Sequence, residues 1–340
     1  MTSAIFIHRG RNPKSDYLGG LITERDFIFD YRGENTLVML WRAWRAAWKL
    51  PRAEVYLVEG GLCLWPVFFR KLFYPRIKII MMVPEPALNW RQRSRWGNWV
   101  MSQVLARADY FLPISDLVAD DLCHYVSKPF SLLHHYSTLD PVSLATIRPD
   151  YRAKSLLFII NRPTETGHTK GLDIVLRIFS ILIERDPEWQ LFLIGAGTEN
   201  LNLSGYGIKD SSGVHLEGKQ DPRPYFARSP YLLAPARYDA FPLAVVEACV
   251  AGCIPLISPT TGSEEFIRET DPSLIIDHHN PAAYAERILS LHTRPVEALA
   301  TLGGRLRELA GRYTRENSIQ ELREAVQQIN QALGTDLILF

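Results

Sequence analysis

Short apolar runs alternate with longer segments of helical period along almost the whole chain, and this alternation restricts the fold more than any other feature. A strand–helix–strand order of this kind predicts parallel sheets with helices on both faces. In the first half, the expected strands are 4–8, 25–30, 54–59, 78–83, 109–114 and 130–134, and the expected helices are 36–49, 62–73, 91–108 and 116–125.

The second half repeats the same order after a polar, proline-containing stretch, 137–153, which is the expected linker. Its expected strands are 155–160, 190–194, 214–217, 231–234, 254–258 and 274–276, and its expected helices are 172–185, 243–251, 281–291, 295–313 and 315–332. The 340 residues exceed what one hydrophobic core usually covers. We therefore predict an α/β protein with two Rossmann-like, doubly wound domains facing a central cleft. The expected domains are 1–145 and 146–325, with 326–340 as the end of the last helix and a tail.

Composition excludes several other classes of protein. With 47% hydrophobic and 22% charged residues, the chain is neither disordered nor fibrous. No apolar run reaches the ~18 to 20 residues that a membrane-spanning helix needs, and the first residues do not resemble a signal peptide. The four cysteines lack C-x-x-C spacing, which predicts neither a disulfide framework nor a structural zinc site. We expect a cytoplasmic protein.

Doubly wound sheets bind ligands at the carboxyl ends of their strands, so functional residues are expected just after strands. Glu247 lies in the apolar helix expected at 243–251, with no basic side chain three or four residues away, and so needs a partner from elsewhere. It could accept hydrogen bonds from ribose hydroxyls while the amides of Leu243 and Ala244 hold phosphate oxygens. The alternative is a glutamate satisfied by a neighbouring helix or by backbone amides.

Two cations follow the first strand of the second half. Arg162 lies in the expected loop and Lys170 lies just before the helix expected at 172–185. Fixed positive charge at such a place suits a diphosphate whose negative charge grows as it departs. The alternative is a pair of solvated cations on a flexible loop. Gly195 and Gly197 follow the next strand, where glycine also serves simply to turn the chain.

Taken together, these segments resemble retaining glycosyltransferases of the GT-B fold, family 4, over most of residues 105–330. The spacing of Asp239 and Glu247 is similar to the E-x7-E region of that family, with aspartate in place of the first glutamate. Arg162 and Lys170-Gly171 are similar to its G-R-x(n)-K-G element. Further similarities are the G-x-G turn at Gly195-Ala196-Gly197 and the strand end at Glu217-Gly218-Lys219.

The resemblance implies a role for each of these positions. Asp239 would lie against the donor sugar and Glu247 would bind the nucleotide ribose. Arg162 and Lys170 would neutralise the leaving diphosphate, and the strand end at Lys219 would hold the base through its backbone. The donor would be a nucleotide-diphosphate sugar, with no further cofactor required.

The first half matches the family less well. Many members carry a histidine after the fourth strand, where this chain has Met82-Val83-Pro84-Glu85-Pro86, so Glu85 is a positional candidate for a catalytic group. Glu59 is another, and capping a loop is an equal alternative for both acids. The pairs His134-His135 and His278-His279 lack the spacing of metal ligands, and the chain contains no D-x-D triplet. We therefore expect no metal.

The stretch 40–107 is unusual because it carries 12 basic and 3 acidic residues. Trp41, Trp44 and Trp48 fall on one helical face beside a stripe of Arg42, Arg45 and Lys49. This composition is typical of a helix at an anionic membrane surface. The alternative is a tryptophan stripe that faces the core, with a solvated basic flank. No motif for nucleic-acid recognition accompanies these cations.

The sequence thus predicts a retaining, metal-independent glycosyltransferase that moves a sugar to an acceptor hydroxyl, on a glycan or a lipid-linked molecule. The second domain would hold the donor and the first would offer the acceptor, in the cytoplasm or peripherally at a membrane. Two alternatives remain, namely a non-catalytic subunit that binds a nucleotide sugar and a nucleotide-sugar epimerase on the same fold.

Overall fold

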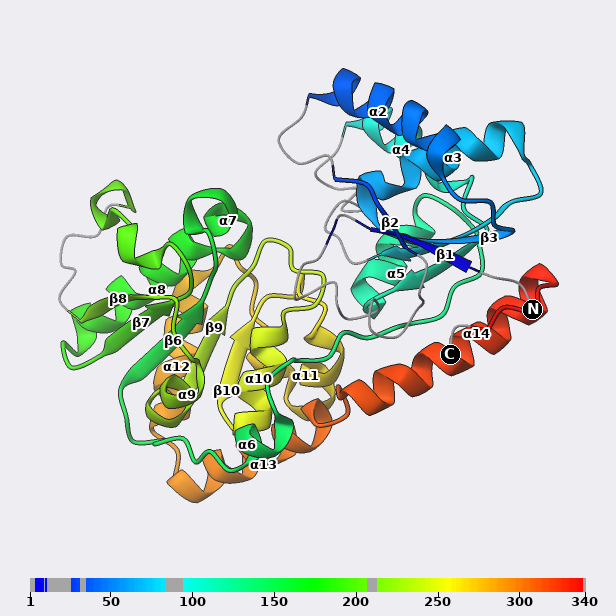
Figure 1. The fold of residues 1–340 in the computed structure, drawn as a ribbon. Coiled ribbons are helices and arrows are strands. Elements are labelled where there is room, and N and C mark those ends of the chain that lie inside the picture. The colour runs from blue at the N-terminus through cyan, green and yellow to red at the C-terminus, as the bar shows by residue number, and fades with distance from the viewer. Residues whose placement is uncertain are drawn as a thin grey trace. The chain divides into compact units, whose positions relative to one another are not determined.

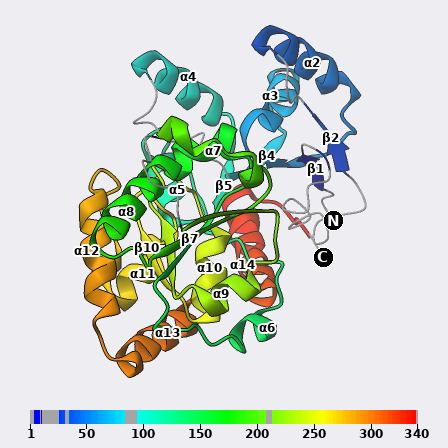
Figure 2. The same ribbon diagram turned by 90° about the vertical axis from the view of Figure 1, so that its left-hand side faces the viewer.

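The chain forms two compact α/β units in a computed structural model, which describes residues 4–8, 10, 26–30, 35–83, 94–206 and 213–338. Residues 1–136 and 315–340 make the first unit, and residues 137–314 make the second. Figures 1 and 2 show the two units in views turned by 90°.

The first unit is built on a parallel five-stranded sheet with the order β2-β1-β3-β4-β5. Its strands are β1 (Ala4–His8), β2 (Asp26–Ile28), β3 (Val55–Glu59), β4 (Lys78–Val83) and β5 (Tyr110–Pro113). Its helices are α2 (Thr36–Lys49), α3 (Leu64–Phe73), α4 (Arg95–Leu105), α5 (Asp116–Cys123) and α14 (Arg315–Leu333), with a 3-10 turn at Gly61–Cys63. Strands β1, β3, β4 and β5 are almost wholly buried, as parallel strands covered on both faces must be.

The second unit has a parallel five-stranded sheet with the order β10-β9-β6-β7-β8. Its strands are β6 (Ser155–Ile159), β7 (Gln190–Ile194), β8 (Val214–Gly218), β9 (Tyr231–Ala234) and β10 (Ile254–Ile257). Its helices are α6 (Pro141–Ala145), α7 (Pro163–Lys170), α8 (Leu172–Arg185), α9 (Arg223–Arg228), α10 (Leu243–Ala251), α11 (Glu264–Thr270), α12 (Pro281–His292) and α13 (Val296–Ala310). Three 3-10 turns lie at Thr198–Asn200, Leu203–Tyr206 and Pro272–Leu274. Helix α8 packs with α12, and α10 packs with α6, α9 and α13 (Figure 1).

Polar side chains cap the N-termini of several of these helices. Asn35, Ser94 and Ser115 accept hydrogen bonds from backbone amides in the first turns of α2, α4 and α5. Asn280 does the same for α12. Such caps satisfy amides that have no partner within the helix, and they fix where each helix starts.

The predicted α/β class with two Rossmann-like sheets is confirmed, but the division of the chain differs from the expected boundaries at 145 and 325. Helix α14 belongs to the first unit because Leu322, Ala325 and Ile329 are buried there with Leu57 and Ile80. The stretch expected as a linker is divided, since α6 packs against α10 and so lies in the second unit.

Three local predictions were wrong. Residues 130–134 run beside β5 but form only an isolated bridge at Phe130, and 274–276 forms only a bridge at Ile275 after a 3-10 turn. Residues 163–170, expected as a loop, form α7.

Candidate functional site

The second unit changes the direction of its strand order between β6 and β9. The chain leaves β6 toward β7 and β8 on one side, whereas β9 continues to β10 on the other. Loops after such neighbouring strands diverge and leave a crevice at their carboxyl ends, which is where open α/β sheets bind ligands. The segments that follow β6 and β9 contain Arg162, Lys170 and Asp239, three of the predicted site residues.

Lys170 and Asp239 meet across this switch point. The Nζ atom of Lys170, at the end of α7, forms an ion pair with Oδ2 of Asp239, in the loop between β9 and α10. The aspartate is held in place, because its N–H donates to Thr260 and its carbonyl accepts from Gly262. Its side chain is 13% exposed, whereas that of Lys170 is 37% exposed, so the ammonium group remains accessible to solvent and to a ligand.

The end of α7 is fixed by the loop after β9. Gly171 has φ of +79°, and a Cβ there would lie 2.3 Å from the carbonyl oxygen of Pro235, so only glycine fits. Arg237 donates to the carbonyls of His168 and Thr169, through its side chain and its backbone N–H respectively. These contacts and Gly171 fix the backbone on both sides of Lys170, and so they orient that residue.

Arg237 also forms a bidentate ion pair with Asp173 in the first turn of α8, with N–O distances of 2.8 and 2.7 Å. These hydrogen bonds hold the pKa of Asp173 below its ordinary value and raise that of Arg237. Sequence reasoning missed this pair. The available signal was the position of Arg237 three residues after a buried strand, with a carboxylate two residues after Gly171.

Arg162 lies at the start of α7 and is the one non-glycine residue with positive φ in the described part of the chain, at φ 53° and ψ 59°. Its backbone N–H donates to Ala196, which ties β6 to the loop after β7. Its side chain is 69% exposed and forms an ion pair with Glu165 at 3.0 Å. The structure therefore places Arg162 beside the switch point but pairs its guanidinium with Glu165.

The glycine turn after β7 packs tightly against the loop after β6. A Cβ at Gly195 would lie 1.9 Å from the carbonyl oxygen of Ile160, and Gly197 has φ of +94°. The Thr198 hydroxyl accepts from the N–H of Gly218 at the end of β8. Gly195 and Gly197 thus bring the ends of β6, β7 and β8 together, and the exposed Lys219 follows directly.

Glu247 lies on α10 and has a partner far along the chain, as expected for a carboxylate in an apolar helix. Its Oε1 accepts a hydrogen bond of 2.5 Å from the hydroxyl of Ser137. Helix α10 begins at Leu243 without a side-chain cap, so the amides of Leu243 and Ala244 belong to an uncapped first turn. Such a turn attracts anions.

Of the two acids that we considered as candidates in the first half, the structure describes one. Glu85 lies outside the described residues. Glu59 ends β3, next to β1 at the switch point of the first sheet, and Gly60 and Gly61 follow with positive φ.

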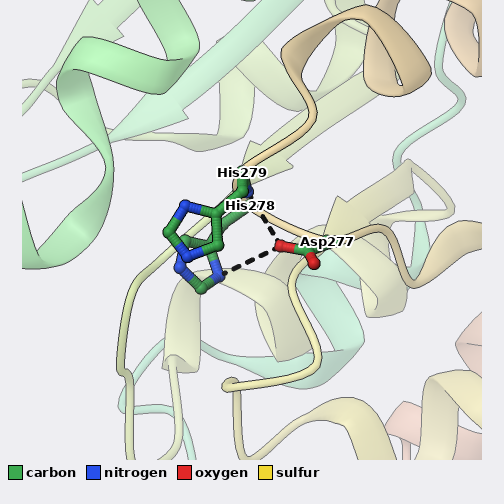
Figure 3. Close-up of side chains that lie close together, drawn as sticks. All are labelled: Asp277, His278 and His279. Atoms are coloured by element: carbon green, nitrogen blue, oxygen red, sulfur yellow. Dashed lines mark hydrogen bonds and ion pairs between the residues drawn. The ribbon is translucent and has the colours of Figure 1, made fainter.

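Asp277, His278 and His279 bring three potential metal ligands within 4.8 Å of one another (Figure 3). The Oδ1 atom of Asp277 already accepts from the backbone N–H of His279 at 2.8 Å and lies 3.8 Å from Nδ1 of His278. Burial lowers the pKa of His278. Because the carboxylate caps this turn before α12, loop capping accounts for its position, and we assign no metal to the cluster.

Comparison with known proteins shows what the second unit and the fold are similar to. Residues 154–294 match the family model described as "Glycosyl transferases group 1". The chain is 26% identical over 318 residues to the D-inositol 3-phosphate glycosyltransferase of Thermobifida fusca, covering 85% of this chain and 66% of that protein. It is 23% identical over 158 residues to an uncharacterized glycosyltransferase of Haemophilus influenzae, covering 45% of this chain and 44% of that protein. The chain thus spans less than two thirds of each of these relatives.

Among solved structures, HepE of Anabaena, in complex with UDP and glucose, matches with a TM-score of 0.70 at 12% identity, over 96% of this chain and 100% of that one. The resemblance to GT-B glycosyltransferases is confirmed by the family model and by the shared fold. The second unit thus shares its sequence pattern with that family, and the chain shares the fold of HepE.

Proposed function

We propose that the protein is a retaining, metal-independent glycosyltransferase that moves a sugar from a nucleotide-diphosphate donor to an acceptor hydroxyl. In this reaction the bond from the anomeric carbon to the diphosphate oxygen breaks, and the electron pair leaves with the diphosphate. The acceptor oxygen bonds to the same face of that carbon and passes its proton to an oxygen of the leaving diphosphate. The acceptor that we propose is a glycan or a lipid-linked molecule.

The Lys170–Asp239 ion pair carries this proposal. It lies at the switch point of the second sheet, the position where doubly wound folds bind nucleotides. The half-exposed ammonium group supplies positive charge for a diphosphate that gains negative charge as the bond breaks. Asp239, held by its own backbone hydrogen bonds, orients both this lysine and the hydroxyls of the donor sugar.

The nucleotide would bind along α10. The uncapped amides of Leu243 and Ala244 suit the phosphate oxygens, and Glu247, one turn further on the same helix, suits the ribose hydroxyls. Gly195 and Gly197 let the backbone come close to the nucleotide, and the strand end at Lys219 would receive the base. Arg162 would turn from Glu165 to the diphosphate, since its exposed ion pair is weak.

Metal independence is proposed because Lys170, Arg162 and the first turn of α10 supply the positive charge that a metal would otherwise provide. Retention is proposed from the resemblance of the Asp239–Glu247 segment to the family motif.

The ribose contact can be tested with a screen of nucleoside diphosphates by thermal shift. The diphosphate with the largest shift is then compared with its 2′,3′-dideoxy analogue, for the wild type and for Glu247→Gln. We expect the wild type to prefer the ribonucleotide by roughly 10-fold or more, as loss of one or two charge-assisted hydrogen bonds implies, and the variant to lose this preference. An unchanged preference in Glu247→Gln would contradict the assigned role.

Turnover decides between the enzyme and its alternatives. Slow donor hydrolysis without acceptor, unaffected by EDTA, supports a metal-independent transferase, and NMR of the product gives the anomeric configuration. Tight donor binding with no turnover over a panel of acceptors would instead indicate a binding subunit. Conversion of the donor to another nucleotide sugar would indicate an epimerase.

A further inference from the structure

The most unusual surface of the first unit is the outer face of α2. Leu37, Trp41, Trp44 and Trp48 recur at helical spacing, and their exposed fractions are 79%, 57%, 39% and 54%. The opposite face of the helix carries small residues that are buried, among them Ala43, Ala46 and Ala47. The helix therefore packs on the unit through its alanines and presents its tryptophans outward, so the alternative of a core-facing tryptophan stripe is wrong.

Helix α3 extends this surface. It packs beside α2 (Figures 1 and 2), and Arg70 donates to the carbonyls of Ala47 and Leu50 at the end of α2. Phe73 is 52% exposed, and its ring lies 5.7 Å from Trp44 and 5.0 Å from Trp48. The aromatic rings support one another from two helices and form a preorganised apolar surface, which monomeric soluble proteins rarely leave uncovered.

The charged side chains within α2 and α3 all have one sign. Helices α2 and α3 contain five basic residues and no acidic one. Arg42, Arg45 and Lys49 form a stripe next to the tryptophans, and the guanidinium of Arg45 lies 4.7 Å from the ring centroid of Trp41. Indole rings flanked by cations suit the boundary between headgroups and acyl chains, where the rings enter and the cations meet lipid phosphates.

We propose that this α2–α3 surface, defined by Trp41, Trp44, Trp48 and Phe73 with Arg42, Arg45 and Lys49, binds an anionic lipid bilayer. Within the described residues no helix is long and apolar enough to span a membrane. The contact that we propose is peripheral. An anionic bilayer is the occupant that this surface fits, because it offers negative charge across the full width of two helices that carry no acids. The inference is independent of the proposed sugar transfer, since it uses none of the residues of the second unit.

The test is co-sedimentation of the full chain with vesicles of phosphatidylcholine, with and without phosphatidylglycerol. We expect binding only when phosphatidylglycerol is present. Raising the ionic strength from about 0.1 M to about 1 M, which shortens the Debye length from ~10 to ~3 Å, should weaken it strongly. Brominated acyl chains should quench the tryptophan fluorescence, which charge attraction without penetration would not cause.

Two variants separate the contributions of charge and rings. Reversing Arg42, Arg45 and Lys49 to Glu should reduce the partition coefficient by at least about 100-fold, since each cation contributes roughly a fivefold factor. The control reverses Arg177, Arg185 and Arg294, three exposed cations of the second unit, and so changes net charge equally. It should change binding by less than about threefold. The variant Trp41→Ala/Trp48→Ala should lose most of the quenching, since only Trp44 of the three tryptophans on this surface remains. Its melting temperature should stay near that of the wild type because both replaced rings are more than half exposed.

Absence of binding to anionic vesicles at low salt would overturn the proposal, as would equal loss of binding in the two charge variants. A dimer in sedimentation velocity that Trp41→Ala/Trp48→Ala abolishes, with no vesicle binding, would instead assign the surface to a second copy of the chain. Because donor binding is measured separately, failure here leaves the proposed transfer reaction untouched.

Discussion

Lys71–Asp109 in the first unit and Lys170–Asp239 in the second are lysine–aspartate ion pairs next to a sheet, and they differ in how far the lysine is enclosed. In the first unit, Nζ of Lys71 lies 2.5 Å from Oδ2 of Asp109 and also donates to the carbonyl of Arg107. The same carboxylate oxygen accepts from the backbone N–H of Ile79. Burial lowers the pKa of Lys71, against the opposing effect of its hydrogen bond to Asp109. In the second unit, Lys170 is more than twice as exposed as Lys71.

If the proposed function is right, the two pairs have different roles. The groups of Lys71 and Asp109 are used by neighbouring backbone and leave little for a ligand, so this pair fixes α3 to the edge of the sheet. Lys170 lies at the carboxyl ends of the strands and keeps its ammonium accessible. Identical residue types therefore imply opposite consequences for substitution in the two units.

The largest effect that we expect from substituting these lysines is on activity. We expect Lys170→Ala to lower kcat/KM by about 1,000-fold, or ~4 kcal/mol, because fixed charge at a leaving group is a large part of catalysis. Lys71→Ala should stay within about threefold of the wild type. Steady-state donor hydrolysis measures both. Equal losses in the two variants would remove the distinction between the pairs.

For stability, we expect Lys71→Ala to have a larger effect than Lys170→Ala. Lys71→Ala leaves a buried carboxylate without its counter-ion and should lower the free energy of unfolding by about 2–3 kcal/mol. Lys170→Ala also leaves a mostly enclosed carboxylate, Asp239, but should cost less, about 1–2 kcal/mol, because Lys170 is more exposed than Lys71 and water can take the place of its ammonium group. Urea denaturation of both variants gives the values. A larger loss for Lys170→Ala would mean that its ion pair is also structural.

We also expect the Arg237–Asp173 pair to affect stability. Its contribution can be measured through its dependence on pH. Since the folded state lowers the pKa of Asp173, its stabilisation is present above the ordinary carboxyl pKa and is lost as pH falls through the folded value. Asp173→Asn should therefore cost about 1–2 kcal/mol at pH 7 and much less near pH 3. Chemical denaturation at both pH values measures the difference. If the destabilisation caused by Asp173→Asn did not change with pH, packing of the side chain and not its charge would account for its effect on α7.

The smallest expected effect concerns the backbone of Arg162. Its left-handed conformation favours glycine, so Arg162→Gly should be more stable than Arg162→Ala by about 1 kcal/mol. Both variants remove the guanidinium and should reduce donor turnover equally. Thermal melts with activity assays separate the backbone from the side chain. Normal turnover in Arg162→Gly would exclude a role for the guanidinium.

Sequence reasoning reached the strand–helix order because that order depends on local patterns. The expected helices 36–49, 172–185 and 243–251 have the observed bounds. Helix α7 was missed because its sequence, PTETGHTK, has no apolar face and is held by Arg237 and Gly171 from other elements. The assignment of α14 to the first unit likewise depends on packing over a separation of more than 180 residues, for which no local pattern exists.

In the candidate site, too, the sequence predicted local features but not contacts between distant residues. Residue types and their places after strands predicted Arg162, Lys170, Asp239 and Glu247 as candidates. Their partners followed only from the tertiary structure: Asp239 for Lys170, Glu165 for Arg162 and Ser137 for Glu247. The orientation of α2 was ambiguous for a different reason, since alanines on one face and tryptophans on the other both read as apolar stripes of the same period.

The position of α14 determines the order in which the protein can be completed during synthesis. The second unit has all its elements once residue 314 has left the ribosome, whereas the first must wait for residues 315–333. Because nascent domains generally fold as they emerge, we expect the first unit to complete its core last, when α14 becomes available to cover Leu57 and Ile80.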